Sequence, residues 1–243
     1  MGITQLIKPF YKDLPKETFR KEPTLGQLCW APILHVNKIP MLMEVERADP
    51  KEHHATKFRI RNLAETDFRG RGKLPIKSLN LRETDELFIN KANKRPAIIV
   101  WGSPIIFEDI KKLLRRMGKG HLQEYCLVLI PIYNIEKADH PGGFPPIMVS
   151  RIKALMYNQF FYCPGVTDIG VTEGVARLDR IQIILPTDRA VYDPLPIALS
   201  DDALAVLLSM LRSWFGSVEE DLNAYKELLR ETLPAEALPR TTP

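Results

Sequence analysis

The apolar residues of this 243-residue chain fall into short runs. The two richest runs, residues 97–100 and 126–132, have the length of a β-strand. No window approaches the roughly 18 consecutive apolar residues that a membrane-spanning helix requires. The sequence therefore predicts short buried strands and no transmembrane helix.

Composition and charge place the chain among folded proteins. Hydrophobic residues make up 45% and charged residues 26%, which excludes intrinsic disorder for the bulk of the chain. The net charge of +4 is small, so a polyanionic partner would have to bind where cations cluster. Residues 1–23 carry charges from Lys8 onward and lack the apolar segment of a signal peptide, which favours a cytoplasmic protein.

The sequence predicts no metal site and no cofactor. Cys29, Cys126 and Cys163 are far apart and lie among apolar or aromatic residues, which favours buried reduced thiols over disulfides or a zinc site. His53 and His54 are adjacent, so on a strand they would point to opposite faces, and we expect both in a surface loop. The short motifs of nucleotide hydrolases, dehydrogenases and zinc proteases are absent from the sequence.

The patterning predicts a mainly β protein with helices, of the α+β class. Strands are expected where apolar runs or alternation occur, at residues 26–33, 56–61, 95–101, 126–133 and 176–184. Helices are expected where apolar residues recur at helical spacing, at residues 104–117, 203–215 and 218–233. Ser200 is expected to cap the second of these helices. Residues 147–163 fit either a strand or a helix.

The expected organisation is one main domain with additions at both ends. Residues 1–24 are polar and interrupted by prolines, so we expect an arm over the surface rather than part of the core. Residues 25–216 are expected to form the main domain, with a long irregular insertion at about residues 34–94. Residues 217–243 would add a C-terminal helix and a tail.

The expected C-terminal helix has an apolar face. Leu222, Tyr225, Leu228 and Leu229 lie at a spacing that suits either a partner's groove or the chain's own domain. Packing on the chain's own domain is the more common arrangement.

Cationic side chains gather in the expected strand at residues 56–61, in the expected helix at residues 104–117 and in the segment 68–73. Single-stranded RNA binding combines such cations with flexible and aromatic elements. Charge runs usually only face water, and both interpretations stay open. The candidate RNA-binding residues are Lys57, Arg59, Arg61, Arg69, Arg71, Lys111, Lys112, Arg115 and Arg116.

Arg95 differs from these cations because it opens an otherwise apolar strand. At the edge of a sheet its guanidinium could bind a phosphate through two parallel hydrogen bonds. The alternative is a salt bridge to a nearby carboxylate.

Five segments follow one another in the order of a known family. They are residues 26–30 (Gly-Gln-Leu-Cys-Trp), 94–100 (Lys-Arg-Pro-Ala-Ile-Ile-Val), 126–133, 174–182 and 199–215. Together they resemble the MazF/PemK/Kid family of toxin endoribonucleases. The resemblance implies an SH3-like small barrel of the MazF/PemK type, with a basic inserted helix and C-terminal helices, and it implies a homodimer.

The resemblance also implies metal-independent cleavage of single-stranded RNA, in growth control or antiviral defence. In this reaction the 2′-hydroxyl attacks the adjacent phosphate, which needs a cation for the developing charge and groups that move protons. Arg95 is the implied cation. Where the family has Thr or Ser this chain has Tyr133, a candidate acid or hydrogen-bond donor. His140 is the candidate titrating group, and a plain turn residue before Pro141 is its alternative role.

Two other functions stay open at this point. Tyr133 in the place of Thr or Ser also suits a catalytically silent barrel that binds a regulatory protein or an antitoxin. A nonspecific nucleic-acid binder is the third hypothesis, and a steep salt dependence without strand scission would identify it.

Overall fold

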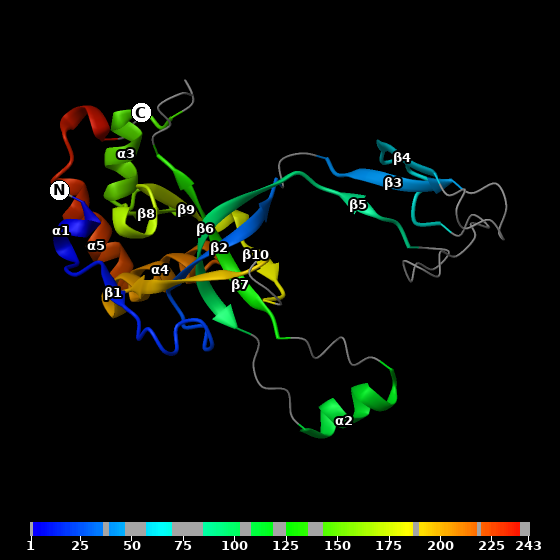
Figure 1. Cartoon of the computed structure of the whole chain (residues 1–243). Coiled ribbons are helices and arrows are strands. Elements are labelled where there is room, and N and C mark those ends of the chain that lie inside the picture. The colour runs from blue at the N-terminus through cyan, green and yellow to red at the C-terminus, as the bar shows by residue number, and fades with distance from the viewer. Residues whose placement is uncertain are drawn as a thin grey trace. The chain divides into compact units, whose positions relative to one another are not determined.

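The computed structural model describes residues 2–35, 39–46, 57–69, 85–102, 108–118, 125–135, 143–186, 190–217 and 220–238. The chain forms two compact units (Figure 1). The first unit comprises Met1–Ile33 and Lys94–Pro243, and the second comprises Leu34–Asn93.

The first unit is built on a curled sheet of eight strands (Figure 1). Along the sheet the order is β1-β11-β2-β6-β7-β9-β8, and β10 pairs with β7. The strands are β1 (Tyr11–Asp13), β2 (Gln27–Leu34), β6 (Ala92–Gly102), β7 (Leu127–Asn134), β8 (Phe160–Cys163), β9 (Gly174–Arg177), β10 (Gln182–Ile184) and β11 (Asp193–Leu199). The pairings of β7 with β6, β9 and β10, like those of β11 with β1 and β2, are antiparallel.

Helices complete the first unit, so the predicted α+β class is confirmed. They are α1 (Ile3–Leu6), α2 (Glu108–Arg116), α3 (Pro146–Lys153), α4 (Asp201–Trp214) and α5 (Glu220–Glu231). Short 3₁₀ turns are η4 (Thr167–Ile169), η5 (Leu178–Arg180) and η6 (Ala235–Ala237). No helix in the described ranges is long and apolar enough to cross a membrane.

Two hydrophobic clusters lie on opposite faces of the sheet. Along β6, Ile98 and Val100 belong to the larger cluster, whereas Ala97 and Ile99 belong to the smaller one. Because successive side chains of a strand point to opposite faces, the sheet separates the two clusters. Helices α1, α3, α4 and α5 contribute to the larger cluster, and the described members of the smaller cluster come from strands and loops alone.

The N-terminal segment is part of this core, so the expectation of a surface arm at residues 1–24 is wrong. Ile3, Ile7 and Phe10 are buried in the larger cluster. Tyr11 of β1 pairs with Leu199 of β11, which adds the segment to the edge of the sheet. Three buried apolar residues within eight positions outweigh the polar and proline-rich composition around them.

Both C-terminal helices form as expected. The Ser200 hydroxyl accepts a hydrogen bond from the Ala203 amide at 3.3 Å and caps α4. On α5, Leu222 and Leu229 are buried in the larger cluster. The chain's own core therefore takes the buried face of α5.

The predicted single strand at residues 176–184 is wrong in its middle. β9 ends at Arg177, the turn η5 follows, and β10 begins only at Gln182. The turn lets one chain segment pair with two different stretches of β7. Alternation alone does not reveal it, because a 3₁₀ turn also places apolar Leu178 in the core.

The cysteines match their expected state in two of three places. Cys29 and Cys163 are buried free thiols, and Cys126 is half-buried. Burial raises the pKa of both buried thiols to about 12, so they stay protonated and unreactive at neutral pH. His53 and His54 lie outside the described residues.

The second unit contains a three-stranded antiparallel sheet in the order β4-β3-β5. Its strands are β3 (Met41–Glu46), β4 (Lys57–Asn62) and β5 (Phe88–Ile89). The strand expected at 56–61 is confirmed as β4, but Phe58 and Ile60 are each 56% exposed rather than buried on one face. The expectation of an irregular segment misses β3 and β5.

Candidate functional site

Two neighbouring strands bring Arg95 and Tyr133 together. β6 and β7 pair with Ala97 opposite Pro131, and continuing this register places Arg95 opposite Tyr133. The guanidinium carbon of Arg95 lies 4.6 Å from the centroid of the Tyr133 ring, within the range of a cation–π interaction. Two of the residues that the sequence selects as catalytic are therefore in direct contact.

These two residues lie on the face of the sheet that carries the smaller cluster. Arg95 is two residues from Ala97 on β6, and Tyr133 is four residues from Leu129 on β7, so alternation places them on the same face as these cluster members. The described members of this cluster include no helical residue.

β9 adds a second arginine next to Tyr133. Val175 lies opposite Tyr133, and Arg177 is two residues further along the same face. The Arg177 guanidinium lies 5.8 Å from the centroid of the Tyr133 ring and 5.0 Å from that of Phe160. The Tyr133 ring thus lies near two guanidinium groups.

The turn η5 supplies the carboxylate that holds Arg177. Arg177 donates from Nε to Asp179 Oδ1 at 2.7 Å and from Nη2 to Oδ2 at 2.5 Å. Arg180 Nε lies 3.6 Å from Asp179 Oδ2. The hydrogen bonds from Arg177 lower the pKa of Asp179, and the same contact raises the pKa of Arg177. Both groups are therefore charged at neutral pH, and Asp179 fixes the orientation of Arg177.

Gly174 allows the close packing of β9 against β7 beside Tyr133. A Cβ atom at this position would lie 2.5 Å from Ile132 Cγ2 and 2.9 Å from the Tyr133 carbonyl oxygen. The second neighbour is backbone and cannot rotate away. A residue without a side chain is therefore required for the two strands to hold Tyr133 where it is.

We call Arg95, Tyr133, Arg177, Asp179 and Arg180 the arginine cluster. It holds three guanidinium groups against one carboxylate, so its local charge is positive. Within the described ranges no carboxylate pairs with Arg95, and the Tyr133 hydroxyl has no hydrogen-bond partner. An unpaired guanidinium and a free hydroxyl beside a second, fixed arginine suit the binding of a phosphodiester.

The other predicted site residues have different surroundings. His140 and Arg71 lie outside the described residues. Lys57, Arg59 and Arg69 are exposed in the second unit. On α2, Lys112, Arg115 and Arg116 are exposed, and Lys111 is half-buried.

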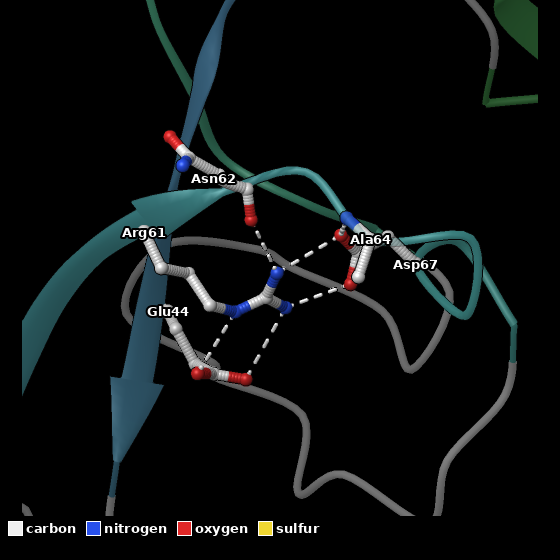
Figure 2. A network of polar contacts seen from close by, with 5 residues as sticks. All are labelled: Glu44, Arg61, Asn62, Ala64 and Asp67. Atoms are coloured by element: carbon white, nitrogen blue, oxygen red, sulfur yellow. Dashed lines mark hydrogen bonds and ion pairs between the residues drawn. The ribbon is translucent and has the colours of Figure 1, made fainter.

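Arg61 is an ion-pair partner of two carboxylates instead of a free cation. Its guanidinium donates to Asp67 Oδ1 at 2.7 Å and to Glu44 Oε2 at 3.1 Å, as Figure 2 shows. It also donates to the Asn62 carbonyl at 2.9 Å, and Asp67 in turn accepts from the Ala64 amide at 2.7 Å. This network joins β3, β4 and the turn after β4, so we assign Arg61 a structural role.

Arg177, Asp179 and Phe160 do not emerge as site residues from the sequence. Arg177 and Asp179 lie inside the segment expected to be one strand, where an Arg-x-Asp pair on one face signals only an ion pair. The contact with Tyr133 depends on the pairing of β9 with β7, and the pairing partner of a strand is not encoded locally.

Comparison of the sequence with models of known protein families and with curated proteins found no match. Among the described residues no three His, Cys, Asp or Glu side chains gather as a metal site would require.

Proposed function

We propose that this chain is a metal-independent endoribonuclease that cleaves single-stranded RNA at the arginine cluster. One observation carries the proposal: the Arg95 guanidinium, without a carboxylate partner in the described ranges, lies against Tyr133 beside the fixed Arg177. Cleavage of a phosphodiester without a metal needs fixed cations of this kind at the scissile phosphate. The curled, mostly antiparallel sheet with its helices is compatible with a small barrel of the MazF/PemK type, which we include in the proposal.

In the proposed reaction the 2′-oxygen of one nucleotide forms a bond to the adjacent phosphorus, and the bond from phosphorus to the 5′-oxygen breaks. The products are a 2′,3′-cyclic phosphate and a free 5′-hydroxyl. Arg95 and Arg177 stabilise the negative charge on the nonbridging oxygens, which is greatest in the pentavalent transition state.

Two proton transfers accompany this displacement. The 2′-hydroxyl loses its proton to a base, and the departing 5′-oxygen gains one. The Tyr133 hydroxyl is the acid of the arginine cluster that can give its proton to the departing 5′-oxygen, and water returns a proton to the phenolate after the products leave. His140 remains the candidate base from the sequence.

The test uses purified full-length protein, end-labelled single-stranded RNA and EDTA. Arg95→Ala removes the unpaired charge, so cleavage should fall by about 100-fold or more, the loss typical of a deleted transition-state donor. Arg95→Lys keeps the positive charge but not the planar guanidinium group. Its cleavage rate should therefore lie between that of the unchanged chain and that of Arg95→Ala. Analysis of the product ends should find a cyclic phosphate.

Arg20→Ala is the matched control, because Arg20 also lies over an aromatic ring, 5.2 Å from the centroid of Phe19, outside the arginine cluster. Its cleavage rate should equal that of the unchanged chain. Equal cleavage by a folded Arg95→Ala variant contradicts the proposal.

Tyr133 favours one second candidate, a phosphate-binding barrel without cleavage. Its ring lies beneath Arg95 at a position where the resembling family has an aliphatic hydroxyl. In that case RNA stays intact, and its binding constant falls steeply with rising salt concentration. Arg95→Ala should make this slope shallower by the amount expected for about one lost phosphate contact.

A further inference from the structure

An open groove lies between α4 and α5, and its floor borders the larger cluster. Its volume is about 470 Å³. Val206 and Leu222, both buried, form part of its lining. Tyr225 and Leu228 also line it and are 40% and 48% exposed. The described part of the chain therefore leaves the apolar side chains of Tyr225 and Leu228 partly uncovered in the groove.

The same groove carries negative charge. Asp202 in the first turn of α4 and Asp221 in the first turn of α5 both line it. Both are exposed, and neither has an ion pair within the described ranges. An apolar groove flanked by unpaired carboxylates is complementary to a helix that combines an apolar stripe with cations.

Helix α2 has these two properties. Ile110 and Leu113 of the helix and Met117 just beyond its end recur at helical spacing and are between 44% and 56% exposed. Two acidic residues open the helix, cations follow at Lys111 and Lys112, and Arg115 and Arg116 lie in its last turn. A nine-residue helix has little stability by itself in water, so an amphipathic one of this length needs a surface to pack on.

We propose that α2 of one copy of this chain packs into the α4–α5 groove of a second copy. Leu113 and Met117 then cover Tyr225 and Leu228 of the partner. The cations of α2 come close to Asp202 and Asp221, so apolar burial and charge pairing favour the same orientation.

A second copy suits these surfaces because each chain carries one helix and one groove. In a two-fold dimer both helices find a groove, and the association closes at two copies. The two contacts form together, which doubles the buried area relative to a single helix in a single groove. The dimer contact does not depend on RNA cleavage.

The first test exchanges charges between the two surfaces in the full chain, with sedimentation equilibrium as the measurement. Lys112→Glu with Arg115→Glu should raise the dimer dissociation constant about tenfold or more, because attraction at the groove becomes repulsion. Asp202→Lys with Asp221→Lys should have the same effect. Combining all four changes should restore association.

Lys57→Glu with Arg59→Glu is the control, because it changes the net charge equally at two exposed residues of β4. It should leave the dissociation constant unchanged. A monomeric unchanged chain, or a dimer that neither charge reversal weakens, overturns the proposal. Restoration by the combined change cannot arise from misfolding, so it separates docking from a general loss of stability.

The second test distinguishes a second copy from the chain's own α2. One preparation carries Leu113→Cys and another carries Leu228→Cys, both with Cys126→Ser. Oxidising the mixture should give a covalent heterodimer that neither preparation forms alone. A third preparation carries both cysteines in one chain. If this chain forms only an internal disulfide and the mixture gives no covalent dimer, the assignment of the groove to a second copy is overturned.

Discussion

Tyr133 shows how one aromatic residue can organise two cations. Its ring lies against Arg95 and near Arg177, which come from strands on either side of β7. Without the ring, the two guanidinium groups would repel each other across a gap. Asp179 offsets part of this repulsion by binding Arg177 through two hydrogen bonds. Among the described residues, Arg95 is left as the arginine of the pair without a carboxylate partner.

The Asp179 contact predicts a pH-dependent stability. Asp179→Asn removes an ionised carboxylate whose side chain is 24% exposed, and we expect a loss of about 1 kcal/mol at pH 7. Because the pKa of Asp179 is lowered in the folded chain, its contribution is complete above the ordinary carboxyl pKa. The contribution disappears as the pH falls through the lowered value. Urea unfolding of both chains between pH 7 and pH 2 measures this.

The stability difference between the two chains should therefore shrink steadily below pH 4 or so, where ordinary carboxyls begin to bind protons. Asp168→Asn, at an exposed aspartate of η4, serves as the control and should change stability by less than about 0.5 kcal/mol. If the difference in unfolding free energy between Asp179→Asn and the unchanged chain stays constant with pH, the charged pair does not contribute to stability.

At the residue scale the sequence identifies two of the five residues of the arginine cluster. Arg95 and Tyr133 stand out because each lies at the end of an apolar strand, where a polar side chain has no packing role. Arg177 and Asp179 are inconspicuous, because their partner strand comes from a segment some 40 residues earlier. Local patterns identify residues at strand ends but not the neighbours that pairing gives them.

At the element scale, continuous apolar runs are the reliable signal. The strands expected at 26–33, 95–101 and 126–133 are confirmed as β2, β6 and β7, with ends that differ by a few residues. β11 is missed because Pro194 and Pro196 argue against an inner strand. The structure resolves this conflict with a register shift between Pro194 and Ala198, so the prolines lie where the ladder is already interrupted.

Helix α5 illustrates how an amphipathic element divides its two faces. Leu229 is fully buried in the larger cluster, whereas Leu228 is half-exposed at the groove. Leu229→Ala should therefore destabilise the chain by about 3 kcal/mol through lost burial and a cavity. Thermal and urea unfolding followed by circular dichroism measure the change.

The control for this substitution is Leu185→Ala, after β10, where the side chain is 40% exposed. It removes the same atoms and should cost less than about 0.5 kcal/mol. Equal costs at the two positions would mean that α5 does not pack on the core.

At the scale of the whole molecule, the two units differ in how their described residues are held together. The members of both hydrophobic clusters of the sheet belong to the first unit. In the second unit Leu42 is buried, and the Arg61 network joins its strands (Figure 2). The sequence indicates this division because continuous apolar runs stop after residue 34. The pairing of β3 with β4 is harder to predict, because apolar and polar residues alternate only weakly in β3.

The chain leaves the first unit and returns to it at adjacent points. The His35 amide donates to the Lys91 carbonyl at 2.8 Å, just beyond the end of β2 and just before β6 begins. A two-residue turn can therefore replace residues 36–90 without moving either strand. Since no described residue of the second unit belongs to the two clusters, the first unit should keep its fold after this excision.

We expect the chain with Asn-Gly in place of residues 36–90 to unfold cooperatively, within about 4 °C of the full chain, or about 1 kcal/mol. Circular dichroism on heating measures this. Extending the excision to residues 32–93 removes Ile33, a buried member of the smaller cluster, and should abolish the cooperative transition. If both excisions unfold the chain, the second unit is needed for the stability of the sheet.

If the chain with the shorter excision folds, it keeps the arginine cluster but lacks Lys57, Arg59 and Arg69. RNA cleavage by that chain then measures the second unit's contribution to substrate binding alone, because Arg95, Tyr133 and Arg177 all lie on strands that the excision leaves in place.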